Sequence, residues 1–348
     1  MSDNWVVAGS GTRAATLSDV AKLAGVSTMT VSRVINSHAK VAPATRDKVR
    51  AAMESLNYRP NLLARGLASG RSRSIGVLTV DTMLYGPRAA LRGIERAAEA
   101  AGYSVTITTL ENPSETAVGA AATLMRTRSC DGVVLVQPLI HGGSGGGSLE
   151  MPMVGMQAGS SDSFPNVSTD HRLGGRLATE HLLGLGHKTV WHLAGPDAWR
   201  ESHERIAGWR DALAAVGAPE PEMMSGDWSA ASGYAMGVEL LAKHPEVTAV
   251  FVANDEMALG VLHAMHERGV GCPRPISIVG FDDTPDSPFY FPGLTTVRQD
   301  FDAMGQSCVE LLLRLIEGEA VPRGIVNLPP TLVIRGSTAP PDEVRSAE

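Results

Sequence analysis

Apolar residues near the amino end of the chain recur at the spacing of one face of a helix. Val20, Leu23 and Ala24 stand at positions i, i+3 and i+4, which predicts a short amphipathic helix. Thr16, with an aspartate three residues on, resembles a capping box that starts this helix, and Gly25 stops it. The pattern therefore predicts a first helix between Thr16 and Gly25.

A second helical pattern follows directly. Ser27 is a suitable N-cap, and Val31 and Val34 are spaced to face the same small core. The side chains that remain free to point outward are Thr28, Met29, Thr30 and Arg33. Residues 43–56 form a third helical pattern that closes this core. Two short helices joined by a glycine turn predict a helix-turn-helix, whose second helix reads base edges in the major groove, and an ordinary antiparallel helix pair is the alternative.

Farther along the chain, apolar runs of strand length alternate with amphipathic helical stretches. The expected buried parallel strands are residues 74–80, 105–109, 133–137, 153–156, 189–193, 250–253 and 276–281. The expected helices include residues 89–101, 173–185, 202–216, 231–243 and 256–268. This alternation predicts an α/β architecture that is long enough for two doubly wound halves. Ligands of such sheets bind at the carboxyl ends of the strands.

Charge divides the chain into two unequal parts. Residues 13–73 carry eleven Lys or Arg against three Asp or Glu, a net charge of +8. Residues 74–348 carry nineteen against thirty-three, a net charge of −14. A basic head on an acidic body favours nucleic-acid binding by the head, because neutralised phosphates supply most of the non-specific affinity. A solvated charged face is the alternative, but it does not explain the asymmetry.

The composition of the chain limits the classes of protein to which it can belong. With 348 residues, of which 43% are hydrophobic and 19% charged, the chain exceeds one typical domain and is globular. Its first residues lack the pattern of a signal peptide, and no apolar run approaches a membrane span, so we expect a cytoplasmic protein without a membrane partner. The three cysteines are far apart and form no CxxC pair, which favours packing roles.

Patterns typical of catalysis are weak in this sequence. The glycine-rich segment 142–148 lacks the Lys-Ser/Thr ending of a phosphate loop, so we expect a surface loop there. The ten histidines form no HExxH pattern, and His187 is typical of a turn before a strand. Adjacent residues such as Asp282 and Asp283 point in different directions, which argues against a catalytic carboxylate pair. We therefore predict no catalytic residues, no metal site, no cofactor and no enzyme activity.

A short segment, residues 61–73, joins the predicted head to the predicted body. It ends in small, polar and basic residues, and alone it is too short for a stable helix because helix nucleation is costly. We expect it to order only when it pairs with a partner chain on DNA. A flexible tether is the alternative.

Motifs along the whole chain agree with one known family. The head contains Val20-Ala21, Ala24-Gly25-Val26-Ser27, Thr30-Val31-Ser32-Arg33-Val34, Thr45-Arg46, Leu56-Asn57-Tyr58 and Arg59-Pro60-Asn61. The body contains Gly226-Asp227-Trp228-Ser229, Val252-Ala253-Asn254-Asp255, Met257-Ala258-Leu259-Gly260, Asp282-Asp283-Thr284, Leu294-Thr295-Thr296 and Gln299-Asp300-Phe301. Together these motifs resemble the lactose-repressor/galactose-repressor (LacI/GalR) family of bacterial transcription regulators, near its galactoside-responsive branch.

The resemblance implies a small all-α helix-turn-helix head and an α/β periplasmic-binding-protein-like body of two doubly wound parallel-sheet subdomains. The expected order is a disordered extension (1–15), the head (16–60), a hinge helix (61–73), a ligand-binding and dimerisation body (74–338) and a tail (339–348). Within the body, the first subdomain is expected to take residues 74–169 and 300–328, and the second residues 170–299 and 329–338. A ligand cleft is expected between them.

Polar residues fall where such a cleft needs them. Asn254 and Asp282 follow expected strands, and an amide or carboxylate there can hold sugar hydroxyls. Arg205 can donate two hydrogen bonds, and Trp228 can stack on a pyranose ring. The resemblance supports ligand contacts by these four residues and extends the candidate lining to Leu84, Pro87, Gln157, Glu201, Gln299 and Phe301.

Several of these residues have a structural alternative. Trp228 suits a hydrophobic core, and Arg205 suits a surface ion pair. The neighbouring carboxylates Asp255 and Asp283 are better suited to capping the helix or turn that follows each of them.

The resemblance also implies DNA contacts by Thr16, Ser27, Thr28, Met29, Thr30, Ser32, Arg33 and Asn36 in the head and by Asn61, Leu67 and Ala68 in the hinge. Leu67 is implied to be the wedge that enters the minor groove and bends the duplex. A tether whose Leu67 packs on the body is the alternative.

Four positions depart from the residues typical of the galactoside-responsive branch. Gln157 replaces a carboxylate, and Glu201 stands where a small hydroxyl residue is expected, so the accepted sugar stereochemistry is expected to differ. Thr28 and Met29 replace a larger aromatic and an amide residue. Because Met favours apolar contact such as a thymine methyl, while Arg33 can still reach guanine, we expect a different operator.

We therefore expect a sugar-responsive transcriptional repressor that binds a near-palindromic operator in double-stranded DNA as a homodimer. An inducer, a galactoside or related sugar, is expected to release it. The residues from Thr338 onward contain no leucine heptads, so we expect no tetramer-forming coiled coil. The alternatives are a sugar-binding transport protein with the same two-lobed body and a regulator activated by a corepressor.

Overall fold

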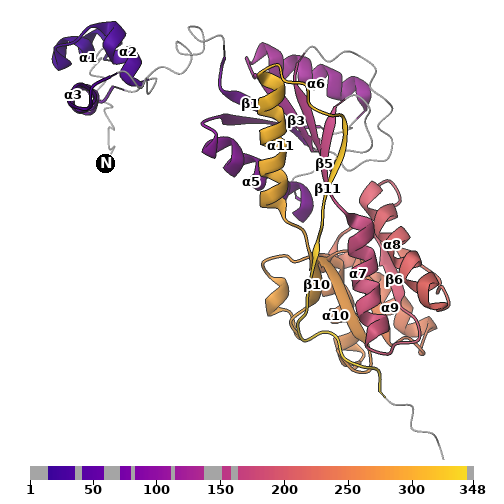
Figure 1. Cartoon of the computed structure of the whole chain (residues 1–348). Coiled ribbons are helices and arrows are strands. Elements are labelled where there is room, and N and C mark those ends of the chain that lie inside the picture. Colours follow the sequence, from indigo (N-terminus) through magenta and orange to yellow (C-terminus); the bar gives the residue numbers. More distant parts are fainter. Residues whose placement is uncertain are drawn as a thin grey trace, which may run out of the picture. The chain divides into compact units, whose positions relative to one another are not determined.

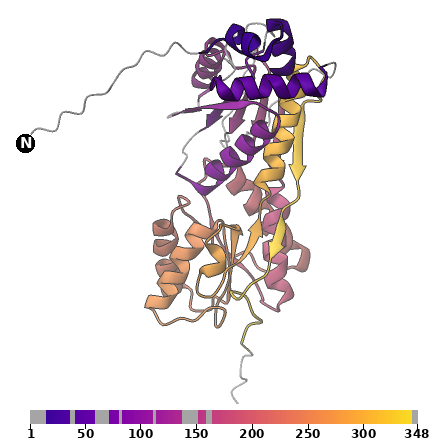
Figure 2. The same ribbon diagram turned by 90° about the vertical axis from the view of Figure 1, so that its left-hand side faces the viewer.

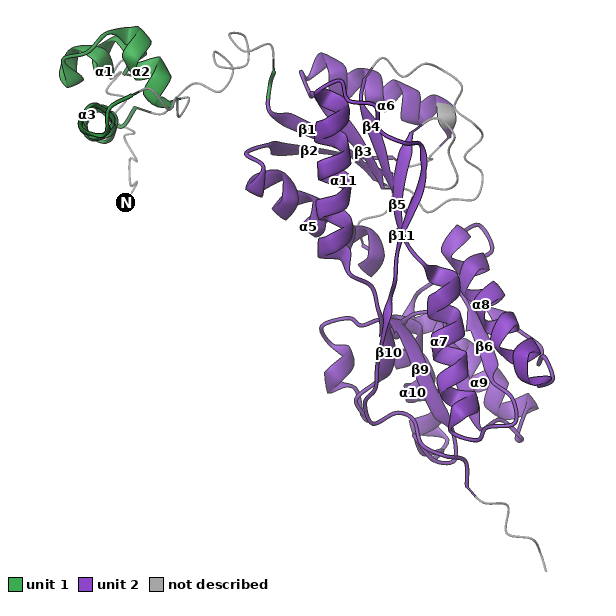
Figure 3. Cartoon of the chain, viewed as in Figure 1, with its two compact units in different colours: residues 1–72 green, residues 73–348 purple. Residues whose placement is uncertain are grey.

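The computed structural model describes residues 15–35, 41–58, 71–79, 83–110, 114–136, 151–157 and 164–342. The chain divides into two units, Met1–Ser72 and Arg73–Glu348 (Figures 1 and 3). The glycine-rich segment 142–148 and most of the predicted hinge lie outside the described residues.

The described part of the first unit contains three helices, α1 (Leu17–Ala24), α2 (Thr28–Ile35) and α3 (Pro43–Ser55). The predicted capping box starts α1, because the Asp19 amide donates to Thr16 Oγ1 at 3.3 Å and the Thr16 amide donates to Asp19 Oδ2 at 2.9 Å. Gly25 ends α1 in the left-handed conformation, with φ of 67°. The Thr30 amide donates to Ser27 Oγ at 3.1 Å, which confirms the predicted N-cap of α2.

One small core holds these helices together. Its buried residues are Val20, Ala21, Val31, Val34, Val49 and Ala52. The prediction that Leu23 faces this core is wrong, since Leu23 is 54% exposed. Successive residues lie about 100° apart around a helix, so a buried face centred near Ala21 and Ala24 leaves Leu23 at its edge.

The second unit contains two sheets, and the first has the strand order β11-β5-β4-β3-β1-β2, with its paired strands parallel. The strands are β1 (Ser74–Thr79), β2 (Ser104–Thr109), β3 (Gly132–Val136), β4 (Met153–Met156), β5 (Pro165–Thr169) and β11 (Gly324–Leu328). Its helices are α5 (Tyr85–Ala100), α6 (Glu115–Thr127) and α11 (Phe301–Ile316). The expectation that residues 105–109 form a buried strand is wrong, because β2 is the edge strand and Ile107 is 51% exposed.

The second sheet has the order β12-β10-β9-β8-β6-β7. Its strands are β6 (Trp191–Ala194), β7 (Met224–Ser225), β8 (Ala249–Val252), β9 (Ser277–Asp282), β10 (Thr295–Arg298) and β12 (Thr331–Val333). The pair of β10 and β12 is antiparallel and the other pairs are parallel. Its helices are α7 (His171–Gly184), α8 (Arg200–Val216), α9 (Ala230–Lys243), α10 (Asp255–Glu267) and the 3-10 turn η1 (Ser287–Phe289).

The chain passes between the two sheets three times within the described part of this unit. It leaves the first sheet after β5, returns to it between β10 and α11, and leaves again between β11 and β12 (Figures 1 and 2). The crossings bring Asp170, Gln299 and Pro330 to the junction of the two sheets. Side chains from either sheet can therefore meet across this junction.

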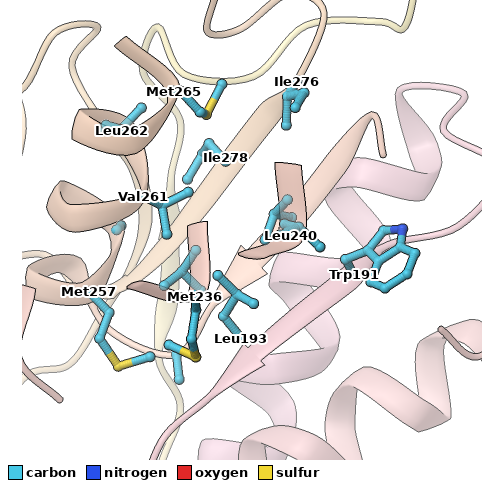
Figure 4. Close-up of a cluster of buried hydrophobic side chains, with 14 of the residues drawn as sticks. Trp191, Leu193, Met236, Leu240, Met257, Val261, Leu262, Met265, Ile276 and Ile278 are labelled. Atoms are coloured by element: carbon cyan, nitrogen blue, oxygen red, sulfur yellow. The ribbon is translucent and has the colours of Figure 1, made fainter. Parts of the chain in front are cut away.

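Each sheet has helices on both faces, because successive residues of a strand point to opposite sides. In β8, Val250 and Val252 pack with α9 and α10, whereas Phe251 packs with α7 and α8. Figure 4 shows the first of these clusters, in which Leu193 and Ile278 of the sheet face Met257 and Val261 of α10. This layering is the predicted doubly wound α/β architecture.

Neighbouring helices approach closely where glycines face each other. A Cβ on Gly93 of α5 would lie 2.2 Å from the Phe301 carbonyl oxygen of α11. A Cβ on Gly175 of α7 would lie 2.3 Å from the Arg205 carbonyl oxygen of α8. These contacts set how far each helix stands from its neighbour, and they set the backbone position of Arg205.

Candidate functional site

The exposed face of α2 carries three of the predicted DNA-contacting side chains. Thr28, Met29 and Arg33 are exposed, with Met29 63% exposed. Ser27 and Thr16 use their hydroxyls to cap helices. Thr30 Oγ1 lies 2.9 Å from Ser27 Oγ, and Ser32 is half-buried. The remaining predicted contacts lie outside the described residues: Asn36, Asn61, Leu67 and Ala68.

A cavity lies between the two sheets of the second unit, at the carboxyl ends of their strands. Nine of the ten predicted ligand residues line it: Leu84, Pro87, Gln157, Glu201, Arg205, Trp228, Asn254, Asp282 and Gln299. Phe301 lines a neighbouring recess instead, where its ring meets the Tyr85 ring edge-on at 6.0 Å. The positions of these residues agree with the rule that ligands bind beyond the strand ends.

Asp282 is the last residue of β9 and is the centre of the polar side of the cavity. Its Oδ1 accepts a 2.6 Å hydrogen bond from Gln299 Nε2 and lies 3.7 Å from Arg205 Nη2. Burial raises the pKa of Asp282 to about 6, although the Arg205 guanidinium opposes this shift. Asp283, the next residue, points elsewhere and pairs with Arg298 and Arg335, as expected for neighbours along a strand.

Arg205 is buried, with only 4% of its surface exposed, so the surface ion pair offered as an alternative by the sequence is wrong. Neighbouring residues of the protein hold its guanidinium in place. Its Nη1 donates to the Ala253 carbonyl oxygen, and its Nε donates to His171 Nδ1 at 3.4 Å. Burial and the nearby Arg205 charge keep the pKa of His171 well below its usual value, so its neutral ring can accept this bond. The guanidinium also packs 3.7 Å from the centre of the Phe281 ring.

Asn254 has a double structural role at the start of α10. Its Oδ1 accepts from the Met257 amide at 2.9 Å, and its Nδ2 donates to the Trp228 carbonyl oxygen at 3.0 Å. The expectation that Asp255 caps this helix is therefore wrong. Asp255 instead accepts from the Thr284 amide at 2.8 Å and from the Thr296 hydroxyl at 2.6 Å, where it connects β9, β10 and α10.

Trp228 belongs both to the hydrophobic core and to the cavity wall. It is 6% exposed, and its left-handed backbone has φ of 74°. Its ring lies 5.7 Å from the Trp199 ring at an angle of 74°, and both rings line the cavity. The Trp228 Nε1 hydrogen is buried and has no hydrogen-bond partner among the described residues.

A chain of side-chain amides joins the two sheets at the back of the cavity. Gln157, beyond the end of β4, donates to Gln299 Oε1 at 3.1 Å. Thr169 at the end of β5 donates to the same oxygen at 2.9 Å, and Gln299 in turn donates to Asp282. The amide at position 157 therefore connects the first sheet to the carboxylate of the second.

Glu201, in the first turn of α8, is an unusual component of the cavity. It is 6% exposed, and its buried Oε2 has no hydrogen-bond partner among the described residues. Burial raises its pKa to about 8, against the opposing effects of its own backbone amide and of Arg205.

The sequence prediction missed six cavity residues: Tyr85, Gly86, Ala90, Val136, Trp199 and Glu256. Val136 ends β3, Trp199 precedes α8, and Glu256 is in the first turn of α10. Their place just beyond strand ends is a signal that was available in the sequence. Tyr85 and its neighbours lie on α5, whose first residues precede the helix expected from 89 onward.

The described residues offer neither a metal site nor a membrane-spanning helix. These residues contain no group of three or more His, Cys, Asp and Glu suited to a metal ion. None of the helices formed by them has the length and apolarity needed to cross a membrane.

Two family models match the chain. Residues 16–61 match bacterial regulatory proteins of the lacI family, and residues 179–338 match a periplasmic binding protein-like domain. The lactose operon repressor of Escherichia coli (strain K12) is 38% identical over 330 residues, which cover 94% of this chain and 91% of that protein. The ribose operon repressor of Escherichia coli (strain K12) is 33% identical over 329 residues, which cover 93% and 99% of the two chains.

Solved structures show the same similarity. The lac repressor dimer bound to operator and the anti-inducer ONPF has a TM-score of 0.80 and 38% identity, covering 93% of this chain and 99% of that one. The complex of the transcriptional regulator CelR with cellobiose has a TM-score of 0.70 and 29% identity, with the same coverage of 93% and 99%. These relatives are transcription regulators, in agreement with the prediction that the chain is not an enzyme.

Proposed function

We propose that this chain, which belongs to the lacI family of bacterial regulatory proteins and is a DNA-binding transcriptional repressor, is controlled by a sugar bound in the cavity between its two sheets. The sugar acts as an inducer: it releases a homodimer of the protein from a near-palindromic operator. The single observation that carries the proposal is the convergence of nine predicted ligand residues on one cavity. The protein acts in the cytoplasm, where it meets operator DNA.

The lining of the cavity suits a sugar. Asp282 and Asn254 present oxygen and nitrogen atoms to hydroxyl groups, and Trp228 presents an indole to an apolar ring face. Because the cavity is lined from both sheets, a bound sugar favours one relative orientation of them. The operator-bound homodimer requires another orientation, so ligand and operator oppose each other by linkage.

In the head, the exposed side chains of α2 support base contacts. Met29 offers an apolar contact to a thymine methyl, and Arg33 offers a bidentate pair to guanine. Hinge contacts by Asn61, Leu67 and Ala68 remain predictions of the sequence. Leu67→Gly should weaken specific DNA binding and leave sugar affinity unchanged.

An exposed apolar segment supports the homodimer. Phe289 is 86% exposed and Phe291 is 99% exposed, on the loop that contains η1. Fully exposed aromatic side chains of this kind mark protein contact surfaces, and we assign their partner as a second copy of the chain. The double variant Phe289→Ser, Phe291→Ser should sediment as a monomer, whereas a stable tetramer of the unaltered chain would contradict the proposal.

The proposal is tested in three steps on the full chain. Operator fragments are first selected from genomic DNA, and their binding should weaken steeply with salt because phosphates are neutralised. A thermal-shift screen of mono- and disaccharides then identifies the effector, since a ligand at about a hundred times its Kd adds roughly 2.7 kcal/mol of stability. In a gel shift, the sugar identified by this screen should release the protein from the operator. Absent or salt-insensitive DNA binding would overturn the regulator, and a sugar that tightens binding would reverse the direction of control.

A further inference from the structure

Glu201 brings into the cavity a buried carboxyl group that the protein itself does not satisfy. The Glu201 carboxyl accepts a hydrogen bond from its own backbone amide, yet Oε2 has no partner among the described residues. Buried polar atoms of folded proteins are nearly always paired, so an unpaired one on a cavity wall is suited to a ligand donor. A bound group that donates to Oε2 would complete this site.

The charges around the cavity favour a donor that is also positive. Among the described residues, three carboxyl side chains line it, those of Glu201, Asp282 and Glu256, against one cation, Arg205. The Arg205 guanidinium faces Asp282, with Nη2 at 3.7 Å, and its Nη1 is bonded to a backbone carbonyl. Glu201 forms no ion pair with any residue that the structure describes. A cationic ligand would favour the ionised form of Glu201 over the protonated form that burial favours in the free protein, and would supply the counter-charge that this ionised form needs.

Aromatic rings line the same cavity as this carboxyl group. Trp199, two residues before Glu201 in sequence, meets the Trp228 ring edge-on, and both rings line the cavity. Aromatic faces combined with carboxylates attract ammonium groups, because the ring quadrupole and the negative charge both stabilise the cation. The unpaired Trp228 Nε1 hydrogen needs an acceptor, which a sugar oxygen provides.

We infer that the effector is an amino sugar, whose protonated amine is held by Glu201 and the Trp199 ring while Asp282 and Asn254 face its hydroxyls. The inference rests on the proposed sugar-responsive function and deepens it. A neutral hydroxyl would supply only the missing donor, whereas an ammonium supplies the donor and the compensating charge. Glu201 is thus the residue that separates this cavity from one selective for neutral sugars.

Calorimetry on the full chain tests the inference with matched sugars. The probes are D-galactose, its 2-amino-2-deoxy and 6-amino-6-deoxy forms, their N-acetyl derivatives, and the same series built on D-glucose. At least one amino sugar should bind about tenfold more tightly than both its hydroxyl parent and its N-acetyl form, the size of one charge-assisted hydrogen bond.

Two variants at position 201 and one control variant test whether Glu201 causes the preference for amino sugars. Glu201→Gln and Glu201→Ser should reduce the amine preference to within about twofold, the residual cation–π contribution of the indole ring. Glu204→Gln removes a carboxylate from the same helix, where it pairs at the surface with Arg200 at 3.5 Å, and should leave the preference intact. Operator binding and thermal melting verify that each variant is folded.

The outcomes separate this inference from the function on which it rests. If a neutral sugar releases the operator and amino sugars bind no more tightly, the repressor function holds and the amino-sugar inference is overturned. If the amine preference survives in both Glu201 variants, Glu201 does not hold the amine. If no sugar of either kind binds, the sugar-responsive function fails and the inference fails with it.

Discussion

The two walls of the cavity differ in chemistry. The second sheet and its helices supply the charged groups and both tryptophans, namely Arg205, Asp282, Glu201, Glu256, Trp199 and Trp228. The first sheet and α5 supply mostly apolar groups, namely Leu84, Pro87, Ala90 and Val136, together with Gln157 and the Tyr85 ring. The difference indicates that the second wall recognises the ligand, while the first closes over it and excludes water.

The two walls are also supported differently. On the polar wall, Arg205 is fixed by His171, Ala253 and Phe281, so its guanidinium is already in place before a ligand arrives. On the apolar wall, Leu84 packs against the hydrophobic core beside the second sheet, and its side chain has no polar atom for a hydrogen bond to hold. Preorganised polar groups determine which ligand binds, whereas apolar packing is adjustable and contributes mainly affinity.

The largest effect is expected on the polar wall from Asp282→Ala. It removes the carboxylate that accepts from Gln299 and faces Arg205, and it leaves a buried guanidinium without its counter-charge. We expect the free energy of unfolding to fall by about 3 kcal/mol and the effector response in a gel shift to be lost, while operator binding persists at low temperature. Asp282→Asn keeps the shape and an oxygen that accepts from Gln299, but not the charge that faces Arg205, so it should restore only part of the stability and none of the response. A normal response in either variant would contradict the roles assigned to the walls.

Helix spacing provides the second test. Gly175→Ala places a Cβ 2.3 Å from the Arg205 carbonyl oxygen, so α8 must shift, and Gly93→Ala forces α5 away from α11 in the same way. Each should lower the free energy of unfolding by about 1 to 3 kcal/mol. Only Gly175→Ala displaces the backbone of Arg205, so it should weaken effector binding more.

Gly184→Ala is the matched control for this test. Gly184 also belongs to α7, and a Cβ there would meet nothing within 4 Å. Denaturant unfolding should show no loss of stability for it. Equal loss of effector affinity in the Gly175 and Gly93 variants would show that the walls are equally adjustable.

The pH dependence of stability gives the third test, again on the polar wall. Burial raises the pKa of Glu201 from 4.5 to about 8, in the presence of Arg205, Arg200 and Asp282. The Glu201 carboxyl therefore binds its proton more tightly in the folded protein than in the unfolded chain. The resulting stabilisation of the fold is complete below about pH 4.5 and is lost as the pH rises to about 8.

The variant Glu201→Gln removes this titration. Its melting temperature, compared with that of the unaltered chain, should rise progressively between pH 5 and pH 8.5, with a gain of at least about 1 kcal/mol at the upper end. A difference that does not change with pH would mean that Glu201 is not buried as the structure shows.

The smallest effect is expected on the apolar wall. Leu84→Ala removes part of an apolar contact that is only half-buried, so effector affinity should fall by about fivefold, or roughly 1 kcal/mol. The ranking of sugars in calorimetry should stay the same, because no polar group is altered. A changed ranking would give the apolar wall a share in recognition.

Two of the strands that the sequence analysis missed, β5 and β12, share one physical reason. β5 begins with proline and contains asparagine, serine and threonine, and β12 spans only three residues, so neither has an apolar run. Their strand conformation depends on pairing with neighbours that are distant in sequence, such as β5 with β11. Capping at Asn254 in place of Asp255 was likewise undecided locally, since both side chains can accept from a helix amide.

The sequence by itself determined the helix-turn-helix, the α/β layering and most of the residues that line the cavity, because capping, helical periodicity and strand ends are local signals. Only the tertiary structure decided which polar groups are already paired inside the protein and which remain for a ligand. The Arg205 guanidinium already donates a hydrogen bond to the Ala253 carbonyl oxygen. Glu201 Oε2 and the Trp228 indole nitrogen, in contrast, are buried and have no hydrogen-bond partner among the described residues. That distinction depends on distances between segments far apart in the chain, which no local pattern encodes.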